Sequence, residues 1–240
     1  MSTNTTRSTI RATDAFQRVM GAPFRGQTYR NLLYLALALP LGLGYFVGLV
    51  TGVALGVGLL ITLVGLPILL VTLSTTTLAA SLEAWLATRL VGVEASVPAV
   101  LRESTLEQGL VLPGDGFLDA VRRLLTAPST WTSVVLVLSK FVFGIVSFVA
   151  LVTSAAVTAT LIAAPFVYED ATVSLGLVSE AGVGAYSVGP WVIDTLPEAL
   201  VVAAGGLVLG VLALNLLNLL TRVQARYTAA LLRVDAGGTA

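Results

Sequence analysis

The sequence predicts an all-α integral membrane protein: a four-helix bundle built from two parallel two-span repeats, with short interfacial amphipathic helices. Three observations support this fold class, namely the composition, the long uncharged segments and the placement of the arginines. Only 11% of the residues are charged, 56% are hydrophobic and the mean hydropathy is +0.94. A soluble domain carries about 25% charged residues, so a bilayer is the solvent that suits this chain.

The first half begins with a polar, basic stretch, residues 1–12, which we expect to be a disordered cytoplasmic tail. No charged side chain occurs from Asn31 to Leu82, a run of 52 residues. A single helix of that length would measure about 78 Å, whereas the hydrocarbon core of a bilayer is about 30 Å thick. Two spans, about 31–52 and 56–80, therefore fit better. We place the turn around Thr51–Gly58, the segment richest in glycine, so that Gly52 and Gly56 flank it.

The second half contains two further apolar blocks. Trp131 to Tyr168 is interrupted only by Lys140, and Ala199 to Thr221 carries no charge. We assign one span to about 132–155 and one to about 198–220, with an extracellular insertion at about 166–197. Whether 153–168 extends the third span or folds back stays open. Four spans result.

The arginines orient the chain, because loops on the cytoplasmic side of a membrane are enriched in Lys and Arg. Every loop arginine precedes the first span, lies between the second and third, or follows the fourth, whereas the segment 167–198 has five acidic residues and no basic one. We expect a cell-membrane, multi-pass protein with both termini and the 83–130 loop in the cytoplasm, and the acidic segment outside.

The two halves resemble each other. "DAFQRVMGAP" (Asp14–Pro23) matches "DAVRRLLTAP" (Asp119–Pro128), and "GLGYFVGLVT" (Gly42–Thr51) matches "GIVSFVALVT" (Gly144–Thr153). We infer repeats at 13–95 and 117–235, joined by a cytoplasmic linker at 96–116 and followed by a tail at 236–240. Each repeat begins with a short amphipathic helix that ends at an Ala-Pro pair and lies either in the inner interface or in a small cytoplasmic layer.

The segments "APFRGQTYRNLLYLALALPLGLGYFVGLVTG", "VGLPILLVTL", "TAPSTWTSVVLVLSKFVFGIVSFV" and "AAPFVYED" resemble the family known as the "putative sensor domain". The resemblance covers about residues 15–235. Members are four-span modules that typically precede prokaryotic membrane histidine kinases, so the resemblance implies signal input at a membrane. The 240 residues contain no histidine, and the sequence ends with "LLRVDAGGTA". We therefore expect a stand-alone module that acts through another protein.

Polar residues inside spans are the first candidates for function, because a charge near mid-bilayer costs roughly 2.5–3.5 kcal/mol on insertion scales and usually pairs or snorkels. Lys140 is the only ionisable group well inside a predicted span. Asn215 and Asn218 share one face of the fourth span, and we hypothesise a contact between Lys140 and Asn215. Snorkelling of Lys140 and simple hydrogen bonds between helices are the alternatives.

A second candidate site is the acidic outer segment, where a cation or an amphiphile could bind; a solvated loop is the alternative. Its residues are Tyr168, Glu169, Asp170, Trp191, Asp194 and Glu198. Small residues let helices approach closely in lipid, and we expect helix packing at Gly42, Gly44, Gly48, Gly144, Gly206 and Gly210. A homodimer interface is an alternative use of these glycines.

The sequence indicates a non-enzymatic module without a cofactor. Cys and His are absent, which excludes thiol nucleophiles, disulfides and Cys/His metal sites, and no nucleotide-binding fingerprint or nucleic-acid-binding feature is found. The expected partners are the lipid bilayer and a separate signalling protein. A small transporter, channel or lipid-handling protein, and a membrane scaffold or assembly subunit, are the competing hypotheses.

Overall fold

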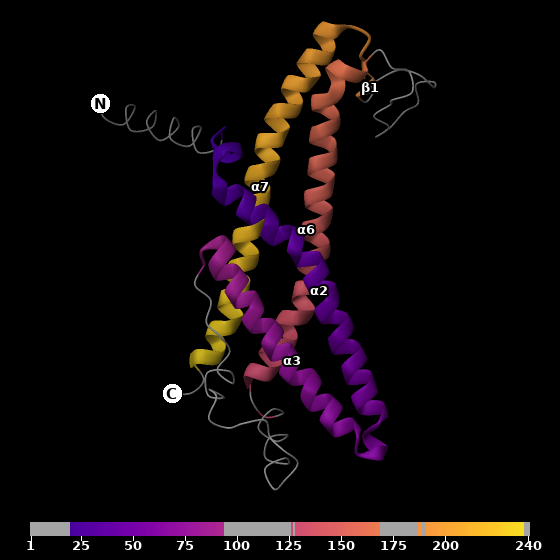
Figure 1. Cartoon of the computed structure of the whole chain (residues 1–240). Coiled ribbons are helices and arrows are strands. Elements are labelled where there is room, and N and C mark those ends of the chain that lie inside the picture. Colours follow the sequence, from indigo (N-terminus) through magenta and orange to yellow (C-terminus); the bar gives the residue numbers. More distant parts are fainter. Residues whose placement is uncertain (1–19, 94–125, 127, 169–186, 189–190, 238–240) are drawn as a thin grey trace, which may run out of the picture. The chain divides into compact units, whose positions relative to one another are not determined.

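The computed structural model describes residues 20–93, 126, 128–168, 187–188 and 191–237. Four long helices dominate it: α2 (Gly26–Gly58), α3 (Gly65–Leu86), α6 (Pro128–Val167) and α7 (Leu196–Gly237). Each is long and apolar enough to cross a bilayer. The prediction of four membrane-spanning helices is therefore confirmed (Figure 1).

The turn between the first two spans lies later than the sequence suggested. Helix α2 continues through Thr51–Gly58, and the chain reverses at residues 59–64, around the short 3-10 helix η2 (Leu60–Thr62). Leu63 adopts the left-handed conformation there, with φ of 61°. A Cβ atom on Gly52 would collide with Thr72, and one on Gly56 would collide with Leu69. These glycines therefore allow α2 and α3 to approach each other and do not form the turn itself.

The second pair of helices is longer than the predicted spans. Helix α6 continues to Val167 with Pro165 inside it, so residues 153–167 extend the third span. Helix α7 contains 42 residues. Before α7 the chain forms a two-residue antiparallel ladder between β1 (Ser187–Val188) and β2 (Trp191–Val192).

The chain divides into two compact units, which cut through α6 and α7. The hairpin unit contains 29–149 and 218–240, and so holds part of each of the four helices. The second unit contains 1–28 and 150–217. In the hairpin unit, small side chains of α3 (Ala80 and Ala84) pack with Leu136 of α6 and Leu232 of α7. In the second unit, Ala164 of α6 packs with Ile193 and with the start of α7.

Helices α2 and α6 approach each other closely at two glycines within the hairpin unit. A Cβ atom on Gly42 would lie 2.7 Å from the carbonyl oxygen of Lys140, and one on Gly144 would lie 2.5 Å from that of Ala38. Lys140 stands four residues before Gly144, as Ala38 stands four before Gly42, so equivalent positions of the two matched segments meet reciprocally. The parallel relation of the two repeats stays a prediction.

The outward surface of the helices is apolar. Leu78, Leu82 and Trp85 form one exposed stripe of α3, and many Leu and Val side chains of α2, α6 and α7 are also exposed. Such a surface suits lipid and not water. The predicted tail at 1–12, the helix before Pro23 up to residue 19, and most of 117–125 and the linker at 96–116 lie outside the described residues, whereas Ala22–Phe24 forms the short 3-10 helix η1.

Candidate functional site: a buried ion pair and the pocket beside it

Lys140 is buried in the hairpin unit and forms an ion pair. Its Nζ atom lies 2.6 Å from Oε2 of Glu83, and the two side chains are only 3% and 1% exposed. The same ammonium donates a hydrogen bond of 2.8 Å to the hydroxyl of Tyr34. It also lies 4.2 Å from the centroid of the Tyr34 ring, within the range of a cation–π interaction. Three helices, α2, α3 and α6, thus meet at one charge; we call Lys140, Glu83 and Tyr34 the charged cluster.

The fourth helix of the unit also reaches the charged cluster. Thr228 of α7 is buried and acts as a hydrogen-bonding neighbour of the Tyr34 hydroxyl. Oε1 of Glu83 is buried and has no hydrogen-bond partner among the described residues. A buried carboxylate with a free acceptor is costly unless it is paired. The ammonium of Lys140 is therefore essential to keeping Glu83 ionised in this position.

The sequence analysis missed Glu83 because it placed the end of the second span at about residue 80. Helix α3 continues to Leu86, and the five-residue π-helical segment η3 (Ala87–Val91) extends it. Glu83 therefore belongs to the candidate span Gly65–Val91. The signal that could have found it is the need of Lys140 for an acidic partner, since Glu83 directly follows the uncharged run.

The two asparagines predicted on α7 have different partners. The amide of Asn218 accepts a hydrogen bond of 2.7 Å from Asn31 of α2. The amide of Asn215 donates to the carbonyl of Val211, in its own helix. The hypothesis of a contact between Lys140 and Asn215 predicted neither Glu83 nor Tyr34, which are the partners of Lys140 in the structure.

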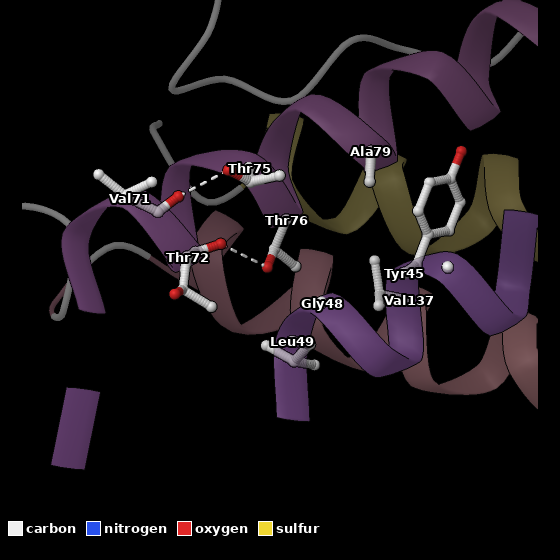
Figure 2. Close-up of a pocket in the computed structure, with 10 residues that line it drawn as sticks. Tyr45, Gly48, Leu49, Val71, Thr72, Thr75, Thr76, Ala79 and Val137 are labelled. Carbon is white, nitrogen blue, oxygen red and sulfur yellow. Dashed lines mark hydrogen bonds between the residues drawn. The ribbon is translucent and has the colours of Figure 1, made fainter. Parts of the chain in front are cut away.

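A pocket of about 280 Å³ lies between α2 and α3, next to the charged cluster. Its residues are Gly44, Tyr45, Gly48, Leu49, Val71, Thr72, Thr75, Thr76, Ala79 and Val137. In Figure 2, Tyr45 stands beside Ala79 at one end of the pocket, and Val71 and Thr72 stand at the other. Glu83 lies one helical turn beyond Ala79, which lines the pocket. The pocket and the ion pair are therefore neighbours.

The glycines predicted for helix packing divide into those at close helix contacts and those with open space beside them. Gly42 and Gly144 lie at the contact of α2 with α6, while in the second unit Gly206 and Gly210 lie against Leu161 and Thr158 of α6. Gly44 and Gly48 have no atom near the position of an added Cβ. They line the pocket instead.

The candidate extracellular residues do not form one cluster among the described residues. Tyr168 packs against the apolar cluster of Ala164 and Ile193. Asp194 is exposed, and its backbone N–H donates to the Glu198 carboxylate at 3.4 Å. Trp191 belongs to β2, whereas Glu169 and Asp170 lie outside the described residues. Within the described ranges, no group of three or more acidic residues is placed to hold a metal ion.

Four apolar helices around a buried ion pair define a polytopic membrane protein of the helical-bundle class. A family model described as "Putative sensor" matches residues 10–232. The chain belongs to this sensor family. No curated protein and no solved structure is similar to it.

Proposed function

We propose that this protein is a non-enzymatic sensor module of the cell membrane that passes a stimulus to a separate signalling protein. The observation that carries the proposal is the charged cluster, a buried ion pair with a tyrosine that connects three spans. Membership of the sensor family also supports a sensor function.

A buried ion pair is suited to switching between discrete states. Lys140 and Glu83 stabilise each other only at short range, and separating them in a low-dielectric interior leaves two uncompensated charges. The helices therefore have few intermediate arrangements: either the pair is formed or another partner must replace it. Sensors work by such two-state elements, whose equilibrium a stimulus biases.

Helix α3 offers a route from the charged cluster to the end of the bundle. Glu83 lies one turn before η3, and the backbone N–H of Ala87 donates to the carbonyl oxygens of Ala84 and Glu83. π-helical segments are rare and are frequent at functional sites. Arg30 of α2 donates to the carbonyl oxygen of Arg89, in the same segment. We infer that a shift of Glu83 changes this end of α3, where a partner would read it.

The test compares the wild type with the double variant Lys140→Met/Glu83→Leu, each purified from native membranes in a lipid-preserving polymer. We expect a kinase or transcription regulator to accompany both proteins in stoichiometric amount, with its output fixed in one state by the double variant because the switch is lost. The exposed-arginine variant Arg226→Met serves as the control and should respond as the wild type does. Absence of any signalling protein under all growth conditions would contradict the proposal.

One observation favours a second function, transport. Glu83 places an acidic residue inside a candidate span, next to a lysine and a pocket, and buried ionisable groups also mark solute and proton pathways. Solute flux into proteoliposomes that Lys140→Ala abolishes would favour this alternative over sensing. A stable complex whose composition does not depend on any stimulus would instead favour a scaffold.

We also propose that both termini and the arginine-rich ends face the cytoplasm. In support, the side chain of Arg30 reaches the carbonyl of Arg89, so the start of α2 and the end of α3 share one side. Because the chain has no cysteine, single thiols can be introduced at Ser104 and Ser179. An impermeant maleimide applied to intact cells should label the Ser179→Cys variant only, and Ser104→Cys should react after permeabilisation. The opposite pattern would overturn this topology.

A further inference from the structure

We propose that the turn between α2 and α3, residues 59–64, lies in the acyl-chain region of the bilayer and does not emerge into water. The turn joins the two helices at the tip of their hairpin (Figure 1), and this tip is an interaction surface for lipid hydrocarbon. The inference is independent of the proposed function, because it concerns only how deep the turn lies in the membrane.

The side chains of the turn are apolar and exposed. Five of its six residues are Leu, Ile or Val. These five side chains are between 38% and 94% exposed, and Ile61 and Leu63 are the most exposed of them. A turn that faces water is normally built from Gly, Pro, Asn, Asp and Ser. By contrast, residues 168–195, which connect α6 and α7, include four acidic residues. The composition of the α2–α3 turn therefore suits hydrocarbon and not water.

Several polar groups of the turn bond to one another, as an environment without water requires. The backbone N–H groups of Thr62 and Gly65 both donate to the carbonyl oxygen of Leu59, at 3.0 and 3.1 Å. The N–H of Leu63 donates to the carbonyl oxygen of Leu60. The hydroxyl of Thr62, the one polar side chain of the turn, also donates to Leu59, at 2.8 Å. This side chain therefore needs no water to satisfy its donor.

The backbone of Leu63 points to the same environment. Its φ of 61° lies in the left-handed region, which glycine adopts freely and which asparagine and aspartate tolerate better than leucine does. In water, each of these residues would relieve the strain and remove an exposed apolar side chain. In hydrocarbon, the leucine side chain offsets the strain by its contact with lipid.

The length of α2 indicates how the turn stays in the membrane. From Asn31, where the uncharged run begins, to Gly58, the helix measures about 42 Å, whereas the hydrocarbon core is about 30 Å thick. An apolar helix longer than the core tilts, which keeps its end in the lipid. The exposed apolar surface of the turn also continues onto Val57 of α2 and Val71 of α3. Because this helix surface faces lipid, lipid is the occupant that the structure favours over a partner protein or a second copy.

The experiment measures how fast a water-borne reagent reaches single thiols, which Ile61→Cys and Thr195→Cys introduce into a chain without cysteine. Thr195 is exposed and directly precedes α7. In a four-span chain the end of α2 and the start of α7 lie on the same side of the membrane, so this control holds for either orientation. A thiol reacts as the thiolate, which needs water, so in native membrane fragments we expect a charged maleimide to label Ile61→Cys at least about tenfold more slowly than Thr195→Cys. After denaturation in SDS the two variants should react at the same rate.

A second measurement distinguishes lipid from protein as the cover of the turn. Each thiol is coupled to the fluorophore bimane in detergent, and the full chain is then reconstituted into bilayers whose lipids carry a nitroxide quencher on the acyl chain or on the headgroup. We expect the acyl-chain nitroxide to quench the Ile61→Cys label more strongly, and the headgroup nitroxide to quench the Thr195→Cys label more strongly. Equal maleimide rates in membranes would overturn the proposal. Slow labelling of Ile61→Cys without quenching by the acyl-chain nitroxide would show that a partner protein or a second copy covers the turn, and would overturn it as well.

Discussion

Replacing Lys140 by Met should lower the free energy of unfolding by about 3–5 kcal/mol, because it leaves Glu83 buried without a counter-charge. Glu83 is 1% exposed, its Oε2 is paired with Lys140, and its Oε1 has no hydrogen-bond partner in the described residues. Denaturant titration in mixed micelles, followed by tryptophan fluorescence, measures the change. The variant Arg226→Met, which removes an exposed cation, should change stability by no more than about 0.5 kcal/mol.

The double variant Lys140→Met/Glu83→Leu completes this prediction. Replacing a whole buried ion pair by apolar side chains is often neutral or stabilising, so we expect the double variant to lie within about 1 kcal/mol of the wild type. The two substitutions would then be strongly non-additive, as expected for groups in direct contact. A Lys140→Met variant as stable as Arg226→Met, or a double variant less stable than either single variant, would contradict the assigned ion pair.

Gly144→Ala should have the next largest effect, a loss of about 1–3 kcal/mol from overpacking. The added methyl group would lie 2.5 Å from the carbonyl oxygen of Ala38 and 2.9 Å from the Cα atom of Leu39. These are backbone atoms of α2, so no side-chain rotation can relieve the contact, and the two helices must move apart. Such a movement would also draw Lys140 away from Tyr34.

Gly44→Ala is the matched control for this prediction. It makes the same substitution in α2, where no atom lies within 4 Å of the new Cβ. Alanine favours a helix over glycine by about 1 kcal/mol, so this variant should be as stable as the wild type or more stable. If Gly144→Ala and Gly44→Ala change stability equally, the close contact of α2 with α6 does not form in the membrane.

The four spans could be predicted because hydropathy and length determine them almost directly. The 52-residue uncharged run before Glu83 exceeds one bilayer crossing, and the structure divides it into α2 and α3. The turn was placed wrongly because glycine has two uses in a membrane helix: it can end the helix, or it can allow a neighbouring helix to approach closely. Gly52 and Gly56 serve the second, which only the position of α3 reveals.

The candidate site was predicted in part. Lys140 could be selected because a charge in an apolar span needs a partner, but the partner depends on which helix faces meet. Glu83 and Tyr34 lie 57 and 106 positions from Lys140 in the chain, so no local pattern connects them. The same holds for Asn218, whose partner Asn31 belongs to the first helix, and for the pocket, whose lining residues come from α2, α3 and α6.

The threonine hydroxyls of α3 have a mechanical consequence. Thr72, Thr75, Thr76 and Thr77 each donate to a carbonyl oxygen one turn earlier, within six consecutive positions. Hydroxyls that share the carbonyls of the helical ladder weaken it slightly and often bend the helix. This stretch of α3 should therefore bend more easily than a helix without such bonds. A force on it would bend α3 and move the carboxylate of Glu83, which lies farther along the same helix.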